Sequence, residues 1–181
     1  NDFLPIIKGN NIAITNLESP LTTHKTPTTK TGPAIKALPK TVEALKFAGF
    51  NLVTLANNHI MDFGRQGLTD TFKNLEAVGI EFLGAGYSFQ QASITLYKTD
   101  NNHRLAFINI AENEWSTTTG DNPGANPLDL IANHRSIVEA RKHADTVFVV
   151  LHGGNEMHNL PSLRMRNTCR FFVDSGASAV I

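Results

Sequence analysis

Apolar and polar positions follow two different periods along the chain, and together they predict a layered α/β fold. Short apolar runs bounded by polar residues or glycine predict strands at 11–16, 52–56, 80–83, 147–151 and 179–181. Apolar residues at helical spacing predict helices at 39–48, 67–78, 128–144 and 161–175. Residues 92–111 hold two apolar stretches around Asp100, Asn101 and Asn102, which predicts a β-hairpin. Strands and helices that alternate in this order favour stacked layers of sheet and helix.

Two of the predicted helices end at glycine, and their apolar residues predict which faces are buried. Gly49 and Gly79 stand where the helices at 39–48 and 67–78 should stop. In the helix at 39–48, we expect the buried face to comprise Val42, Leu45, Phe47 and Ala48. In the helix at 161–175, we expect it to comprise Leu163, Met165, Cys169, Phe172 and Val173.

Two long polar stretches are expected to be loops. Residues 17–33 (LESPLTTHKTPTTKTGP) are rich in Thr and Pro, and a loop of this length is more often functional or mobile than a plain connection. Residues 112–127 contain Gly, Asn, Pro and Thr and are expected to be exposed.

Composition places the chain among ordinary soluble globular proteins, as one domain over residues 1–181. It is 41% hydrophobic and 18% charged, and its 16 Lys and Arg balance 16 Asp and Glu. Without a net positive field, nucleic acid is not an expected partner, and any bound anion must be held locally. Cys169 is the only cysteine, which excludes an internal disulfide and a thiolate zinc site.

The two ends of the sequence look cut. The chain does not start with Met, residues 1–20 lack the pattern of a secretory signal, and "ASAVI" ends as a strand-like run. We therefore expect the 181 residues to be a piece that lacks terminal strands at both ends.

Polar side chains follow three of the predicted strands, at the point where each strand ends. Because the carboxyl ends of strands in such sheets share one edge, these side chains should form a single rim. The segments are NLES, NNH and HGGNE, which present Asn16, Glu18, Asn57, Asn58, His59, His152 and Glu156.

This mixture of oxygen and imidazole donors suits a divalent ion such as Mn²⁺, Fe²⁺ or Zn²⁺. A carboxylate that bridges two such ions holds a pair that activates water for hydrolysis. Each residue alone also has an ordinary interpretation: a surface imidazole for His152, a turn for Asn57 and Asn58, and a loop cap for Glu18. Their order along the chain and their shared rim favour the metal site.

Four segments resemble, in the same order, the bacterial capsule synthesis protein A family. They are "NLESPLT", "VTLANNHIMDFGRQGLTDTFKNLEAVGIEFLGAG", "VVLHGGNE" and "SGASAVI", and the ANNH block is the most specific. This family, the CapA/PgsA-like proteins of poly-γ-glutamate biosynthesis, is a branch of the calcineurin-like metallophosphoesterase superfamily. The resemblance implies a metallophosphatase-like four-layer α-β-β-α sandwich with a dinuclear metal site on the rim.

The resemblance also implies roles for individual residues. Glu18, Asn58 and His152 are the expected metal ligands, with Glu18 bridging the ions. His59 is the catalytic imidazole that meets the substrate or leaving group, and Asp62 orients it. The residues assigned to substrate binding are Lys25, Lys30, Asn57 and Glu156, although for the two lysines a solvated loop position is the ordinary alternative.

Two motifs of the superfamily are absent from these 181 residues. They are a Gly-Asp motif after an N-terminal strand and a G-H-x-P-H-like stretch after a C-terminal strand, and both normally supply metal ligands. Ile60 also stands where the superfamily often has an acid. We therefore expect the divalent metal pair to belong to the intact protein and to be weak or absent in this chain.

The expected function is a metal-dependent hydrolase site, acting on a phosphoester or a γ-glutamyl amide, in a protein of capsule or poly-γ-glutamate biosynthesis. The alternative is a non-catalytic accessory subunit of a membrane-bound complex that makes or exports the polymer. The expected partners are an anionic polymer or phosphoester substrate and a membrane synthase. The resemblance further implies an extracytoplasmic, membrane-anchored location in the full-length protein.

Overall fold

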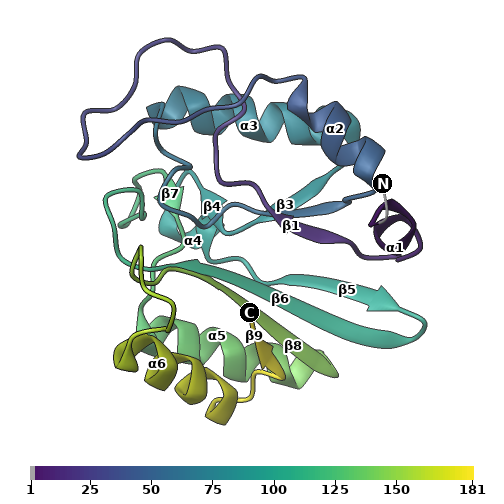
Figure 1. Cartoon of the computed structure of the whole chain (residues 1–181). Coiled ribbons are helices and arrows are strands. Elements are labelled where there is room, and N and C mark those ends of the chain that lie inside the picture. Colours follow the sequence, from purple (N-terminus) through teal and green to yellow (C-terminus); the bar gives the residue numbers. More distant parts are fainter. Residues whose placement is uncertain (1–2) are drawn as a thin grey trace.

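The computed structural model describes residues 3–181 and shows four layers in the order helix, sheet, sheet, helix (Figure 1). The helices are α1 (Leu4–Lys8), α2 (Thr41–Ala48), α3 (Gly64–Val78), α4 (Phe89–Ala92), α5 (Leu130–His143) and α6 (Leu163–Asp174). The strands are β1 (Ile14–Asn16), β2 (Leu52–Thr54), β3 (Glu81–Leu83), β4 (Ala85–Gly86), β5 (Leu96–Asp100), β6 (His103–Ala111), β7 (Gly124–Ala125), β8 (Thr146–His152) and β9 (Ala179–Val180).

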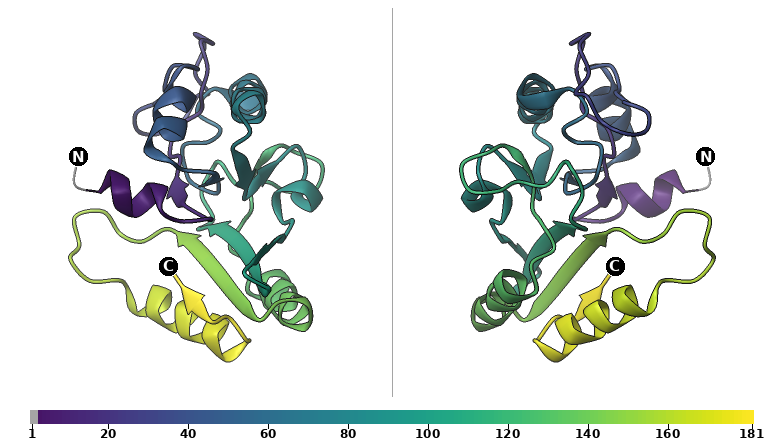
Figure 2. Two further views of the ribbon diagram at one scale, coloured as in Figure 1. Left: turned by 90° about the vertical axis from the view of Figure 1, so that its right-hand side faces the viewer. Right: turned by 90° about the vertical axis from the view of Figure 1, so that its left-hand side faces the viewer.

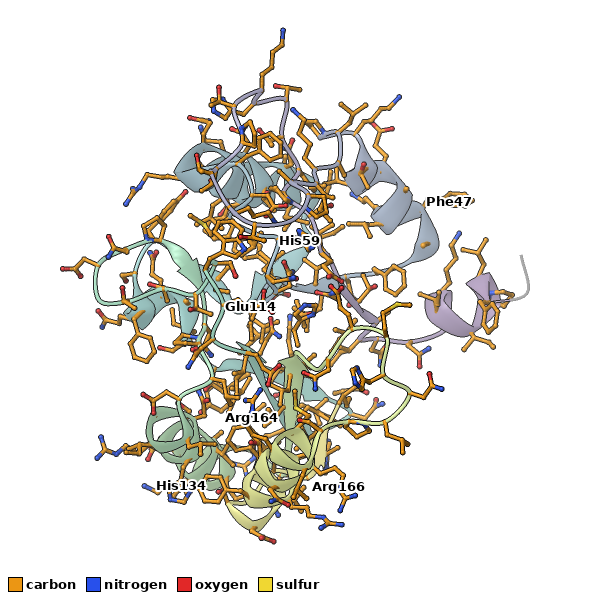
Figure 3. All side chains as sticks on the ribbon, turned by 60° about the vertical axis from the view of Figure 1, so that its left-hand side comes forward. Phe47, His59, Glu114, His134, Arg164 and Arg166 are labelled. Atoms are coloured by element: carbon orange, nitrogen blue, oxygen red, sulfur yellow. The ribbon has the colours of Figure 1, made fainter. Side chains whose placement is uncertain are left out.

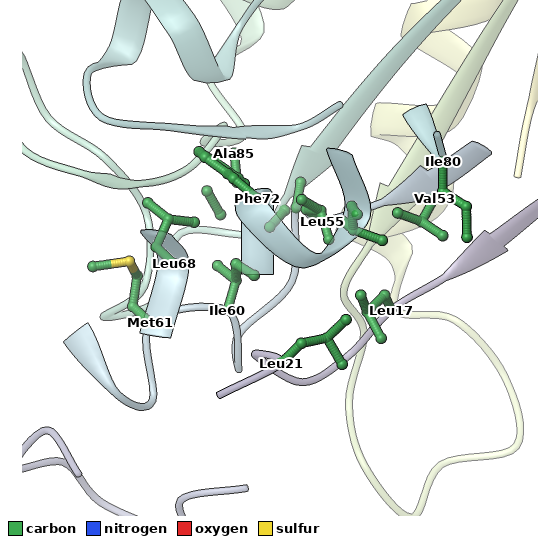
Figure 4. Close-up of a cluster of buried hydrophobic side chains, with 14 of the residues drawn as sticks. Leu17, Leu21, Val53, Leu55, Ile60, Met61, Leu68, Phe72, Ile80 and Ala85 are labelled. Atoms are coloured by element: carbon green, nitrogen blue, oxygen red, sulfur yellow. The ribbon is translucent and has the colours of Figure 1, made fainter. Parts of the chain in front are cut away.

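The first sheet has the order β1-β2-β3, and all three strands are parallel. Helices α2 and α3 cover its outer face (Figure 1). Between them lies a buried apolar cluster that includes Val53, Leu55, Leu68 and Leu75 (Figure 4). Because Asn16 pairs in register with Thr54, the polar residues that follow β1 and β2 leave the sheet at the same edge.

The second sheet has the order β5-β6-β8-β9, with β5 and β6 antiparallel and the other pairs parallel. Helices α5 and α6 cover its outer face (Figure 1). The buried residues Ile108, Ile137, Val149 and Phe172 belong to the cluster between these layers. Figure 2 shows the same sandwich from its two sides.

The inner faces of the two sheets pack on each other through apolar side chains and one buried amide. Leu52 and Leu83 of the first sheet form one buried cluster with Phe107 of the second. The Oδ1 atom of Asn109 on β6 accepts a hydrogen bond from the backbone N–H of Ala56 at 2.7 Å, and its Nδ2 donates to the carbonyl of Val150 at 3.1 Å. Gly84 has a positive φ of 92°, and a Cβ there would lie 2.0 Å from Asn109 Oδ1. The amide thus bridges the sheets where only glycine fits opposite.

The predicted α/β fold is confirmed, including the hairpin. β5 and β6 pair from Leu96 to Phe107, and the turn residues Asn101 and Asn102 adopt φ values of 48° and 67°. Some boundaries differ: α3 begins at Gly64, three residues before the predicted start, and β5 begins at Leu96. The short elements α1, α4, β4 and β7 lacked a periodic signal because each is too short to show one.

Three residues that were expected to point inward are exposed. Phe47 is 67% exposed because it lies five residues after Val42, about 140° around the helix from it. Val173 follows the fully buried Phe172, and neighbouring helical residues point about 100° apart. Leu163 is the first residue of α6 and is 66% exposed.

The segment 112–127 was expected to be an exposed loop and is partly buried. Ser116 and Thr118 are almost fully buried, and β7 pairs with β4.

No helix within residues 3–181 is both long enough and apolar enough to span a membrane.

Candidate functional site

The strand-end residues meet in a pocket at one edge of the sandwich. The pocket has a volume of about 410 Å³ and lies between the loops that follow β1, β2, β6 and β8. His59, after β2, and Glu114, after β6, lie near this edge (Figure 3). The polar residues that line it are Glu18, Asn58, His59, Glu114, His152, Asn155, Glu156, His158 and Asn159.

The three predicted metal ligands converge. His152 Nε2 lies 3.1 Å from Asn58 Oδ1 and 3.7 Å from Glu18 Oε1. Asn16 Nδ2 donates a hydrogen bond to Glu18 Oε2 at 3.2 Å, which holds this carboxylate from the side away from His152. Three segments that are far apart in the sequence therefore bring one nitrogen and two oxygen atoms together, as the strand-end pattern predicted.

The spacing of these atoms fits a single cation. Two ligands that are each about 2.1 Å from one ion lie roughly 3.0–3.5 Å apart at tetrahedral or octahedral angles. The separations around His152 Nε2 are close to this range. Within residues 3–181, however, no group of three or more His, Cys, Asp or Glu side chains is placed to hold a metal ion. Glu18, Asn58 and His152 are thus the described residues that could hold an ion, and they do not complete a dinuclear site.

His59 is oriented by a buried carboxylate. Asp62 is fully buried, and its Oδ2 accepts hydrogen bonds from His59 Nδ1 at 2.8 Å and from the backbone N–H of Ile35 at 2.7 Å. Since a carboxylate only accepts, the shorter of the two contacts of Nδ1, 2.8 Å to Asp62 against 3.3 Å to Lys30 Nζ, favours the tautomer with its proton on Nδ1. The ring nitrogen on the opposite side, Nε2, has no hydrogen-bond partner within residues 3–181 and belongs to a side chain that lines the pocket.

The Thr-rich loop after β1 is fastened to this carboxylate. Lys30 Nζ donates to Asp62 Oδ1 at 2.5 Å and lies 4.8 Å from the ring centroid of Trp115. The backbone N–H of Thr28 donates to the Asp62 carbonyl at 2.8 Å, and its hydroxyl donates to the Met61 carbonyl at 2.9 Å. This part of the loop is therefore a fixed wall behind His59.

Asn57 holds the turn that presents His59. Its Nδ2 donates to the Leu17 carbonyl at 3.0 Å and reaches Asn16 Oδ1 at 3.3 Å, while its Oδ1 accepts from the His59 N–H at 3.1 Å. The Ser116 hydroxyl donates to the Asn57 carbonyl at 2.9 Å. Every polar atom of this buried side chain is bonded inside the protein.

Of the four residues assigned to substrate binding, only Glu156 lines the pocket. Asn57 is buried beneath it, and Lys30 is paired with Asp62 with 5% of its side chain exposed. Lys25 is exposed on the loop and is not part of the lining.

Two acidic residues of the site did not stand out in the sequence. Glu114 lines the pocket, and Glu112 Oε2 accepts a hydrogen bond from the backbone N–H of Gly154 at 2.7 Å. Both follow β6, so the rule that singled out Glu18 and His152 also applies to them. They were placed in an exposed loop because the turn residues of 112–127 dominate the pattern.

The pocket is acidic. Its lining includes Glu18, Glu114 and Glu156 but no lysine or arginine. An anion that enters it without a cation meets like charges, and such repulsion weakens binding.

The whole chain, residues 1–181, matches the family model described as "Bacterial capsule synthesis protein PGA_cap". It is 30% identical to the "PGA biosynthesis protein CapA" of Bacillus subtilis (strain 168) over 98% of this chain and 48% of that protein. It is 32% identical to the "Capsule biosynthesis protein CapA" of Bacillus anthracis over 81% of this chain and 37% of that protein. The chain thus spans less than half the length of these curated relatives.

A third relative, from Mycobacterium tuberculosis, is named as a polyglutamine synthesis accessory protein and is 32% identical over 58% of this chain and 28% of its own. Among solved structures, a hypothetical protein from Thermus thermophilus has the same fold, with a TM-score of 0.54 and 18% identity over 98% of this chain and 57% of that one. The match to the family model over all 181 residues shows that this chain belongs to the family of bacterial capsule synthesis proteins.

Proposed function

We propose that this chain carries a metal-dependent hydrolase site of a protein that acts in the synthesis of an anionic capsule polymer. The observation that carries the proposal is the convergence of Glu18, Asn58 and His152 in a pocket that His59 also lines. The relatives named for capsule and PGA biosynthesis support the biological role.

The charge of the pocket supports a cation as part of the site. A phosphoester and a γ-glutamyl chain are both anionic, and three carboxylates line the pocket without a lysine or arginine. A divalent ion held by Glu18, Asn58 and His152 would reverse the local charge and admit such a substrate. The mixed nitrogen and oxygen donors suit Mn²⁺, Fe²⁺ or Zn²⁺.

The residues of the chain divide the remaining work. When bound, a divalent ion lowers the pKa of water and polarises the bond to be cleaved. His59, held by Asp62 through Nδ1, presents Nε2 to the pocket, where it can take a proton from the attacking water and pass it to the departing oxygen or nitrogen. Asn57 fixes the backbone at His59, so that the imidazole is in position before a substrate arrives. The ligands of a second ion lie outside the described residues in this proposal.

The same proposal covers partners and place. The substrate is the anionic polymer itself or a phosphoester, and a membrane synthase is the partner. The full-length protein acts outside the cytoplasm from a membrane anchor. These features rest on family resemblance.

A non-catalytic accessory role is the second candidate, and one structural observation favours it. No group of three or more His, Cys, Asp or Glu side chains is placed to hold a metal within residues 3–181. In this case the acidic rim serves as a binding surface for the synthase complex. The name of the mycobacterial relative, a polyglutamine synthesis accessory protein, agrees with this role.

Metal binding and turnover of the full-length protein distinguish the two functions. Mn²⁺ binding is measured by calorimetry, and hydrolysis of p-nitrophenyl phosphate and of poly-γ-glutamate is followed before and after chelation. The hydrolase predicts metal-dependent turnover that falls by about 100-fold or more in His59→Ala. His103→Ala, an exposed imidazole at the hairpin, is the matched control and should leave turnover unchanged. Bound metal without turnover of either substrate would favour the accessory role, and no metal binding at all would contradict the site.

A further inference from the structure

One wall of the pocket is a loop, residues 153–162, that hardly touches the rest of the protein. It connects β8 to α6 and extends away from the sandwich (Figure 2). The hydrogen bonds of residues 155–161 stay within the loop: His158 N–H reaches the Asn155 carbonyl at 3.4 Å, and His158 Nδ1 reaches the Glu156 carbonyl at 2.9 Å. Met157 at its tip is 100% exposed. What fixes this loop must therefore act at its ends.

Both ends are held by a single carboxylate, that of Glu112. Its Oε2 accepts the backbone N–H of Gly154 at 2.7 Å, at the start of the loop. Its Oε1 pairs with the guanidinium of Arg164, in the first turn of α6 and just past the end of the loop. The Glu112 side chain is 11% exposed, whereas that of Arg164 is 64% exposed. A largely buried acid thus joins two segments that are ten residues apart.

The backbone of the loop is shaped to rest on this acid. A Cβ at Gly153 would lie 2.4 Å from Glu112 Cγ, so no side chain fits between them. Gly154 has a φ of 123°, a conformation that other residues rarely adopt. The pair of glycines lets the chain turn closely around the carboxylate.

The same acid borders His152. The backbone N–H of Glu112 donates to the His152 carbonyl at 2.9 Å, which continues the ladder between β6 and β8. The side chain of Glu112 holds the amide two residues after His152. One residue consequently holds the backbone at and directly after His152, while the Nε2 atom of His152 faces Asn58 and Glu18.

We propose that Glu112 is a positioning residue whose carboxylate ties both ends of loop 153–162 and thereby keeps His152 against Asn58 and Glu18. Arg164 supplies the second half of this clamp. The part of the inference that concerns metal affinity rests on the proposed function. The part that concerns the loop does not.

The test compares four variants of the full-length protein. Glu112→Ala removes both contacts, and Glu112→Gln keeps an acceptor for the Gly154 N–H but loses the ion pair. Arg164→Gln removes only the ion pair, and because this side chain is mostly exposed the variant should fold. Arg166→Gln is the matched control, since Arg166 is an exposed residue of the same helix, about 200° around the axis from Arg164 (Figure 3).

Three measurements follow the clamp: hydrogen exchange and limited proteolysis of residues 153–162, the imidazole NMR signals of His152, and the dissociation constant of Mn²⁺. We expect Glu112→Ala to speed loop proteolysis by about 10-fold or more, to shift the His152 signals and to weaken Mn²⁺ binding by about 10 to 100-fold. Arg164→Gln should speed proteolysis with a smaller loss of affinity, and Glu112→Gln should match it. Arg166→Gln should change nothing.

The outcomes separate this inference from the proposed function. Loop proteolysis and His152 signals that stay as in the wild type in both Glu112→Ala and Arg164→Gln would overturn the clamp. Mn²⁺ affinity unchanged in Glu112→Ala, with the loop opened, would overturn the positioning of His152. If the wild-type protein binds no Mn²⁺, the proposed function fails. Hydrogen exchange of residues 153–162 then still shows whether Glu112 ties the two ends of the loop.

Discussion

The two imidazoles of the site stand in opposite surroundings. His59 is hydrogen-bonded to the fully buried Asp62, whose carboxylate also accepts hydrogen bonds from Lys30 Nζ and from the backbone N–H of Ile35. His152 is the last residue of its strand and is followed by a loop that one carboxylate holds from below. The first imidazole is therefore supported from a buried region, whereas the second borders an exposed loop that is held at its ends.

This difference suits a division of roles. A group that transfers a proton gains from a fixed position, because misplacement by a small distance costs much of the rate. A group that binds an ion or borders a substrate gains from a wall that can move as the ligand enters. The structure places a buried support behind His59 and an exposed loop beside His152. Substitutions at Asp62, Asn57 and Asp145 test how far the contrast extends.

The largest loss of stability is expected where His59 loses the carboxylate of Asp62. Asp62→Ala leaves the Lys30 ammonium, 5% exposed, without its partner. Removal of one member of a buried ion pair typically costs about 3–5 kcal/mol. We expect the free energy of unfolding, measured in urea, to fall by about this amount. Glu156→Ala on the exposed loop should change it by less than about 0.5 kcal/mol. If Asp62→Ala and Glu156→Ala lower the free energy of unfolding equally, the surroundings of His59 and His152 do not differ in the way described.

A smaller effect is expected for the turn that presents His59. Asn57→Ala removes the acceptor of the His59 N–H and the donor to the Leu17 carbonyl, and both groups are left in a buried region. Unpaired buried groups of this kind cost about 1–3 kcal/mol. Urea unfolding measures the loss, and the His59 imidazole signals should also shift, because its backbone is no longer held. A variant as stable as the wild type would show that water replaces the amide.

The smallest effect is expected at an exposed ion pair that offers a reference for the buried one. Arg104 donates hydrogen bonds to Asp145 through its backbone and its guanidinium, and these contacts hold the pKa of Asp145 well below its ordinary value. Since the folded pKa is the lower one, the pair stabilises the protein above the unfolded pKa of about 4, and the effect fades as the pH falls toward the folded value.

Asp145→Asn should consequently be slightly less stable than the wild type at neutral pH, and the difference should shrink in acid. Thermal unfolding at neutral and acidic pH measures it. A difference that stays constant with pH would show that the charge of Asp145 is irrelevant to stability.

The layers and the rim could be predicted from the sequence because both depend on local patterns. Leu52 to Ala56 shows a buried strand, and the polar residues Asn58 and His59 come directly after it. Because parallel strands tend to end at one edge, the sequence alone also predicts that Glu18 and His152 lie near these two residues. Predictions of this kind succeed when one rule of topology applies to several segments at once.

The supporting contacts could not be predicted because they join segments without a shared pattern. Lys30 lies in a Thr-rich stretch where a solvated lysine is the ordinary expectation, and only the fold places it against Asp62. Glu112 lies among turn residues, and its partner Arg164 is 52 positions away. Asn109 appears within an apolar strand, with nothing to indicate that its amide bridges two sheets.

The strands of each main sheet are continuous in sequence, as the colours of Figure 1 show: β1, β2 and β3 lie within residues 14–83, and β5, β6, β8 and β9 lie within residues 96–180. During synthesis on a ribosome, the first half can assemble with short-range contacts before the second half has emerged. Glu18, Asn58 and His59 belong to the first half, whereas His152 and the Ser116 hydroxyl that holds the Asn57 carbonyl come only with the later half. A nascent chain that ends before β8 thus lacks His152, and the pocket is complete only when both halves are joined.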